Sequence, residues 1–242
     1  MAKILQVIAS HKGLEIGRCN YTWLNPLAYN SSRNFTFKDF VITNPIAVDN
    51  SGHSFINVSV CITNTYGAVI ELNKFKIVPI EHVDFIENGD IKVYGNLVPD
   101  WYTDVYEQPL IDVFYLWDNE NSFVDIEKVP ETIHKFSYFQ ARGIFSGLPK
   151  QLIQGTVIID AELIEDTYDF YDALAINLVG KKGFMGSSYD SLVDCLIESH
   201  NGNSSIHLIF TNTAHLKVIL GNEYLNDIVC LFEQYNINIQ LL

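Results

Sequence analysis

The sequence predicts an α+β protein of two domains, a mostly antiparallel β domain followed by a small α/β domain. Two observations lead to this fold class. Short apolar runs separated by Asn, Gly, Pro and Asp fill residues 1 to about 130, and no long helical period is expected among them. After Gly155, strand-like runs alternate with helical stretches, which is the pattern that builds a parallel sheet. We place the boundary near residue 150, so the predicted domains are residues 1–150 and 151–242.

The β domain is predicted from runs with period two. Residues 56–62 alternate apolar and polar side chains, as a half-buried strand does. Further strands are expected at 68–72, 75–80 and 91–94, the last after the turn sequence Asn88-Gly89-Asp90. Residues 130–154 are expected to connect the domains. A short helix can begin at Pro130-Glu131-Thr132, and Gly147-Leu148-Pro149 would end it.

The α/β domain is expected to contain three strands and three helices and to fold without the first 150 residues. The strands are expected at 156–159, 206–210 and 237–241. The helices are expected after Asp166-Thr167, after Gly186 and across 225–232. Strands that alternate with helices in this way form a parallel sheet, so we expect a three-stranded parallel sheet.

The formal net charge of -14 makes nucleic acid an unsuitable direct partner, because phosphate binding needs clustered Lys and Arg. An acidic surface suits a basic protein instead. The charge is concentrated toward the end of the chain. Residues 151–242 hold 12 acids, 3 bases and no Arg. The alternative explanation of the charge is solubility alone.

Several classes of function have no support in the sequence. No metal-ligand spacing, phosphate-binding loop or nucleophilic motif occurs, so we expect no enzyme, no metal and no cofactor. No apolar run has the length of a signal peptide or a membrane span, so we expect a cytoplasmic protein without membrane contact. The four cysteines are expected to be buried thiols of a reducing compartment: Cys19, Cys61, Cys195 and Cys230.

The segment 184–196 carries most of the functional information. Ser187 or Ser188 is a good N-cap for the helix expected after Gly186. An apolar face is expected from Leu192, Val193, Leu196 and Ile197.

Three acids lie beside that face. Asp190, Asp194 and Glu198 are spaced i, i+4 and i+8, so they form a stripe along the helix. The helix dipole favours Asp190 in the first turn but does not account for Asp194 in the second. Two explanations of the stripe remain open, a solvated helix face and a binding surface for a basic partner.

The segment resembles the barstar family of ribonuclease inhibitors. The shared features are the aromatic opening, the Gly, both Asp, the Leu between them and the Cys-Leu ending. The resemblance covers about residues 155–242, and residues 1–150 have no counterpart in that family. It implies an inhibitor, or immunity protein, that plugs the active site of a basic ribonuclease toxin with carboxylates in the places of RNA phosphates.

The resemblance also implies roles for single residues. Asp190 and Asp194 match the two aspartates of the family, Phe184 matches a tyrosine that packs on the enzyme, and Gly186 matches the loop glycine. Two positions depart from the pattern. Ser187 stands where the family has a loop acid, and Val193 stands where it has a tryptophan.

A further acid of the family has no clear match in this sequence. Glu233 or Asp227 on the last helix can take its place, and Glu198 continues the stripe of the earlier helix. The target therefore need not be the same ribonuclease.

Two rival functions remain. The barstar-like domain can be a general protein-interaction module while the N-terminal β domain carries the main function. The protein can also be an enzyme with its site in the β domain. Binding that is confined to residues 1–150 would favour the interaction module, and a co-purified basic nuclease would favour the inhibitor.

Overall fold

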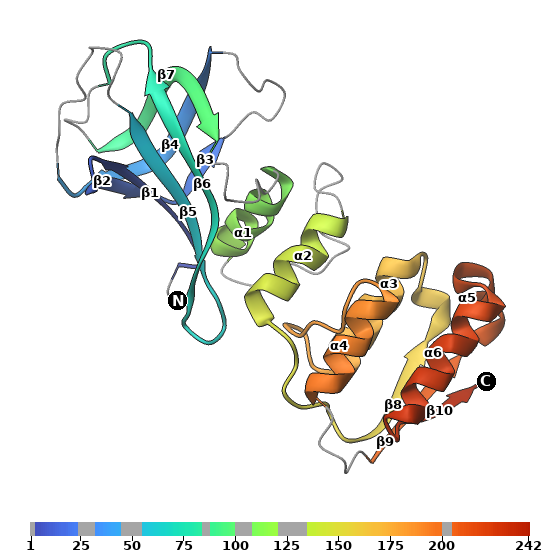
Figure 1. Ribbon diagram of the computed structural model, residues 1–242. Helices are drawn as coiled ribbons and strands as arrows, with labels where there is room; N and C mark the ends of the chain where they lie inside the picture. Colours follow the sequence, from blue (N-terminus) through green and yellow to red (C-terminus); the bar gives the residue numbers. More distant parts are fainter. Residues whose placement is uncertain are drawn as a thin grey trace. The chain divides into compact units, whose positions relative to one another are not determined.

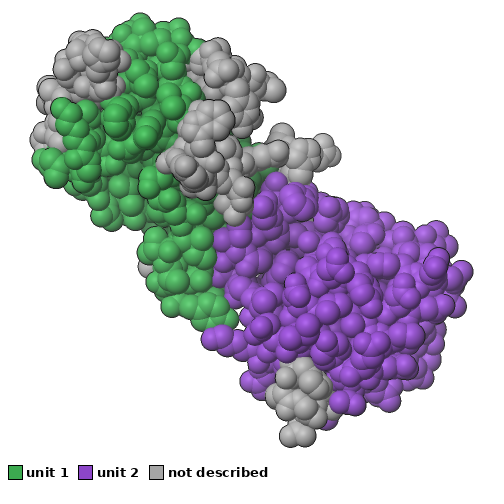
Figure 2. All heavy atoms as spheres, in the orientation of Figure 1, with its two compact units in different colours: residues 1–133 green, residues 134–242 purple. Residues whose placement is uncertain are grey.

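The structure is a computed structural model of the chain. It describes residues 3–23, 32–44, 55–83, 88–99, 108–120, 135–199 and 205–242. The chain divides into two compact units, unit 1 (residues 1–133) and unit 2 (residues 134–242), drawn in green and purple in Figure 2. Unit 1 is built mainly of strands, and unit 2 consists of helices and a small sheet (Figure 1).

Unit 1 is an antiparallel β-barrel, which confirms the predicted antiparallel β domain. Six strands run around the barrel in the order β2-β1-β5-β6-β7-β4, the β2–β4 pairing closes it, and β3 pairs with β4. The strands are β1 (Leu5–His11), β2 (Leu14–Cys19), β3 (Tyr21–Trp23), β4 (Ser32–Ile42), β5 (Ile56–Thr63), β6 (Val69–Pro79) and β7 (Gly89–Pro99).

The period-two pattern of the barrel strands places their apolar side chains in the core. In β5, Ile56, Val58 and Val60 are fully buried. The β1–β2 turn consists of Lys12 and Gly13, which have φ angles of 48° and 80°. Two successive positive φ angles give a type I′ turn, whose twist matches that of the strands it joins.

The sequence predicted two strands where the structure has the single strand β6. A β-bulge explains the apparent break: Val60 pairs with Asn73, but the next residue, Cys61, pairs with Glu71. The extra residue is Leu72, so Leu72 and Asn73 are both buried in succession. The bulge interrupts the period-two pattern at this point, so the sequence pattern suggests that a strand ends at residue 72.

The expectation of no long helix before residue 130 is wrong. Helix α1 (Gln108–Glu120) buries Leu110, Phe114 and Trp117 on one side. Near its end, the Asp118 carboxylate accepts hydrogen bonds from the amides of Ile4 and Leu5, at 2.7 and 2.9 Å. The helix is thereby tied to the start of β1.

Unit 2 contains a three-stranded parallel sheet in the order β10-β9-β8, as predicted. Its elements are α2 (Lys135–Ser146), β8 (Gly155–Asp160), α3 (Thr167–Leu178), α4 (Tyr189–Ser199), β9 (Ile206–Thr211), α5 (Thr213–Leu220), α6 (Asn222–Gln234) and β10 (Asn238–Leu241).

One face of this sheet lies against helices. Val157 and Ile159 of β8 are buried on it, and Phe210 of β9 stacks on Phe170 of α3 with ring centroids 5.9 Å apart. The opposite face is open along β8, where Ile158 is 62% exposed.

The described part of residues 151–242 contains four α-helices, one more than expected. The additional helix is α5, which buries only Thr213 and Leu216 and leaves Val218 80% exposed. Its buried face is too small to produce a clear period in the sequence. Asn212 precedes it in the left-handed conformation and gives it no side-chain cap.

The chain divides earlier than the expected boundary near residue 150. The division falls between Ile133 and His134, so helix α2 belongs to unit 2. The ring of Phe139 in α2 stacks on Tyr168 of α3 at 5.4 Å, which explains this assignment. The expected helix start at residues 130–132 lies outside the described residues, whereas α2 ends directly before Gly147, as expected.

Candidate functional site

Helix α4 begins with a reciprocal cap made by two serines. The Ser188 hydroxyl accepts a hydrogen bond from the Ser191 amide at 3.3 Å. In return, the Ser191 hydroxyl accepts from the amides of Ser187 and Ser188 at 2.8 and 2.9 Å. Ser188 is thus the N-cap, and Ser191 takes the part that Glu or Gln plays in a capping box. Sequence reasoning missed Ser191, although the Ser-x-x-Ser spacing signals it.

The buried face of α4 differs from the expected one. Leu192 and Leu196 are buried as predicted, but Ile197 is 54% exposed. Cys195 and Ser199 are buried instead. Positions 192, 195, 196 and 199 follow the i, i+3, i+4, i+7 spacing of a helix face. The buried face is therefore rotated toward Cys195 and Ser199 and away from Ile197.

The three acids of the stripe all lie on the exposed side of α4. Asp190, Asp194 and Glu198 are exposed, and none of them forms an ion pair within the described parts of the chain. Successive members are about 6 Å apart along the helix axis. The helix carries no Lys or Arg that could neutralise them. The stripe is therefore a patch of negative charge that no neighbouring base of the helix compensates.

Helix α6 adds a second set of acids without bases. Its sequence includes the exposed residues Glu223, Asp227 and Glu233 and no Lys or Arg. The ring of Tyr224 lies 6.4 Å from that of Tyr189, so the first turns of α6 and α4 are neighbours. Asp227 is about one turn from Tyr224, whereas Glu233 is about 13 Å from Tyr224 along the helix axis. Of the two acids considered for the last helix, Asp227 is therefore the one closer to the contact between the first turns of α4 and α6.

A buried tyrosine fastens these two helix ends to α3. The hydroxyl of Tyr171 in α3 shares a hydrogen bond with the Tyr224 hydroxyl. Burial and this bond raise the pKa of Tyr171, and the nearby Asp190 carboxylate adds to the effect. Asp190 therefore lies at the junction of three helices.

The loop before α4 contains the two other residues suggested by the resemblance. Gly186 has φ of 89°, and a Cβ there would lie 2.7 Å from the Leu192 amide nitrogen, so only glycine fits. Phe184 is half-buried, with its ring over Gly143 of α2. The Phe184 ring thus packs within unit 2.

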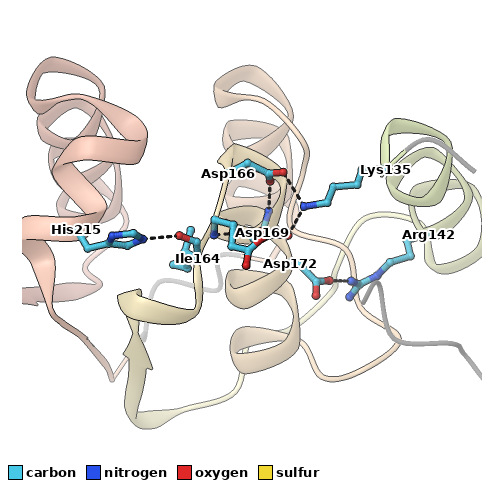
Figure 3. A network of polar contacts seen from close by, with 8 residues as sticks. Lys135, Arg142, Ile164, Asp166, Asp169, Asp172 and His215 are labelled. Atoms are coloured by element: carbon cyan, nitrogen blue, oxygen red, sulfur yellow. Dashed lines mark hydrogen bonds and ion pairs between the residues drawn. The ribbon is translucent and has the colours of Figure 1, made fainter. Parts of the chain in front are cut away.

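Charged residues hold α2 and α3 together, as Figure 3 shows. Lys135 bonds the carboxylates of Asp166 and Asp169 at 2.6 and 2.9 Å, and Asp166 is also the N-cap of α3. Burial alone would raise the pKa of Asp166, but the Lys135 ammonium and the Asp169 amide more than offset it and lower that pKa. Arg142 forms a third ion pair between these helices, with Asp172.

The cysteines are free thiols, but one of them is not buried as expected. Cys230 of α6 is exposed, whereas the other three are buried. Burial raises the pKa of Cys195 to about 12, and its thiol donates to the Phe184 carbonyl. Cys195 therefore links α4 to the preceding loop, and its burial disfavours the reactive thiolate form.

Metal-binding clusters and membrane spans were also sought in the described stretches. There, no group of three or more His, Cys, Asp or Glu is arranged to hold a metal ion. In the same stretches, no helix has the length and apolar character that a membrane crossing requires.

Comparisons with known proteins give no match to this chain, whether with protein-family models, curated proteins or solved structures. The resemblance to the barstar family therefore rests on the residues of segment 184–196 and on the order of the elements around it.

Proposed function

We propose that unit 2 is a protein inhibitor, or immunity protein, that binds and occludes the active site of a basic ribonuclease or related nuclease toxin. The observation that carries this proposal is the stripe of exposed, unpaired carboxylates on α4, Asp190, Asp194 and Glu198. Like charges at i,i+4 cost an isolated helix a few tenths of a kcal/mol per pair. The positive charges of a basic active site would attract all three carboxylates and offset that repulsion.

The surrounding charges support a basic protein as the partner. Residues 134–242 hold twelve acidic and six basic residues. Two of the six bases, Lys135 and Arg142, are engaged in ion pairs with Asp166, Asp169 and Asp172. The acids of α4 and α6 have no such partner among the described residues. Steering by such a field speeds association and weakens with salt.

The fold is also compatible with the proposal. The resemblance implies a small α/β domain with a three-stranded parallel sheet, and unit 2 has one. The segment 184–196 supplies the loop and the helix that would enter the active site. Inhibition by occlusion needs no turnover, so the protein itself is expected to cleave neither RNA nor DNA.

The test is a binding and inhibition assay with the full chain. The probe is the small basic ribonuclease that the barstar family inhibits, and lysozyme serves as a basic protein that is not a nuclease. We expect stoichiometric loss of ribonuclease activity and no comparable binding to lysozyme. If the chain binds both proteins alike, its acidic surface attracts cations without recognising an active site, and the proposal is wrong for this enzyme.

A further inference from the structure

Helix α2 contains the most deeply buried charged side chain of the described residues. Arg142 is 1% exposed, although it lies in a region that the sequence marks as a connection. A buried guanidinium is costly unless its charge and its N–H groups all find partners. The partners of Arg142 therefore show what this side chain holds together.

Arg142 joins two separate parts of unit 2. One terminal nitrogen, Nη1, donates to the carboxylate of Asp172 in α3. The other two guanidinium nitrogens, Nε and Nη2, both donate to the backbone carbonyl of Gly183, at 2.9 and 2.5 Å. Gly183 lies in the loop before α4. The planar fork of Arg can make both connections at once, which a Lys ammonium cannot do with the same geometry.

Neighbouring residues of α2 hold the same loop. The Phe184 ring covers Gly143, where a Cβ would lie 3.3 Å from it. The Ser146 hydroxyl donates to the Lys182 carbonyl. Three residues within about one turn of α2 thus contact three successive residues of the loop.

The loop is in turn coupled closely to the acidic helix. The Phe184 carbonyl accepts from the Cys195 thiol, and Gly186 is wedged against Ser191 and Leu192. A displacement of the loop would therefore move the first turn of α4, which carries Asp190.

We infer that Arg142 is a positioning residue for α4, and that the binding module begins at α2 rather than at β8. Arg142 fixes the Gly183 carbonyl, which fixes the loop, which sets the position of Asp190. The consequence for binding rests on the function proposed above, whereas the effect on the loop does not. Residues outside the barstar-like region would then belong to the inhibitor.

The experiment uses full-length variants. The double variant Arg142→Met/Asp172→Leu removes both charges and keeps apolar volume, a replacement that often preserves stability. Arg142→Lys keeps the charge opposite Asp172 but loses the fork to Gly183. Lys135→Gln is the matched control, because it breaks the other two ion pairs of α2, with Asp166 and Asp169, without touching the loop.

Hydrogen exchange of residues 182–192 is measured first, and binding to the basic ribonuclease second. We expect cooperative unfolding to persist and exchange of the loop to accelerate at least about tenfold in both Arg142 variants, the factor that matches one lost charged hydrogen bond. The affinity of both Arg142 variants for the ribonuclease should fall by a similar factor, mainly through faster dissociation. In Lys135→Gln, the exchange rate of the loop and the affinity should both stay near the wild-type values.

The outcomes separate the two proposals. Loop exchange that stays unchanged in both Arg142 variants overturns the positioning role, whether or not the ribonuclease binds. Faster exchange with unchanged affinity overturns its link to binding. If wild type does not bind the ribonuclease at all, the proposed function fails for this target, and the exchange data still decide the role of Arg142. If the double variant does not fold, the Arg142→Lys data decide.

Discussion

The rings of Tyr189 and Tyr224 lie with their centroids 6.4 Å apart and join the first turn of α4 to the first turn of α6. Both helices carry acids and no bases. The contact therefore brings two acidic helix ends together in spite of their mutual repulsion. The Tyr171 hydroxyl of α3 forms a hydrogen bond with that of Tyr224 and so stabilises the junction.

Removal of the Tyr224 hydroxyl should weaken this junction. Tyr224→Phe leaves the buried hydroxyl of Tyr171 without its partner, which costs about 1–3 kcal/mol of unfolding free energy. Urea denaturation of the full chain measures it. Tyr189→Phe is the control and should stay within about 0.5 kcal/mol of wild type. Equal stability of the two variants would show that the hydroxyl bond contributes little.

Asp194 should be an energetic centre of binding. Truncation to alanine leaves the partner's Arg or Lys buried without a counter-charge, so Asp194→Ala should weaken binding by about 2–5 kcal/mol. The measurement is titration of the basic ribonuclease at low and high salt.

The control for this prediction is Glu162→Ala, since Glu162 is an exposed acid outside α4. Salt should slow the association of both variants, because exposed charges more than about 8–10 Å apart are largely screened at physiological ionic strength. If Asp194→Ala binds as tightly as Glu162→Ala, the stripe is a solvated helix face and the inhibitor uses another surface.

A fragment that begins at residue 134 should be more stable than one that begins at residue 151. The shorter fragment lacks Arg142 and the buried aromatic residues Tyr138, Phe139 and Phe145 of α2. We expect it to be less stable by about 3 kcal/mol or more. Thermal unfolding of both fragments by circular dichroism measures the difference. Identical melting temperatures would mean that α2 is dispensable, as the sequence alone suggested.

Acid should destabilise unit 2 partly through Asp166. The folded-state pKa of Asp166 lies below its ordinary value, so its contribution is complete above the unfolded pKa of about 4. It is lost as the pH falls through the folded pKa. Asp166→Asn should therefore be less stable than wild type at neutral pH, with a gap that closes as the pH falls through the folded-state pKa. Denaturation curves from pH 2 to 7 test this, and a gap independent of pH would rule out the ion pair as its source.

One thiol per native chain should react with a thiol reagent. Cys230 is exposed, whereas burial raises the pKa of Cys19 and of Cys195 to about 12, and that of Cys61 above its usual range. Titration with Ellman's reagent should give one fast equivalent, and four after unfolding. Cys230→Ser should abolish the fast phase, and a fast phase that survives would place an accessible thiol elsewhere.

The sequence predicted elements with strong local signals and missed those defined by tertiary contacts. The period of 56–62 and the Asp166 cap correspond directly to β5 and α3. The bulge at Leu72 depends on pairing between strands, which no single strand reveals. The acids of α4 could be found from spacing alone. Arg142 could not, because its partners Asp172 and Gly183 are 30 and 41 residues away.

The closed barrel and the open sheet carry different risks of aggregation. Pairing of β2 with β4 joins the two ends of the barrel sheet, whereas the sheet of unit 2 ends at β8 and β10. A free strand edge exposes backbone groups that can pair with another chain. Along β8, Ile158 is 62% exposed and Asp160 is the one charged residue of the strand. Under heat or mild denaturant, fibril-like association of this protein would therefore begin at unit 2, with Asp160 as the charge that opposes it.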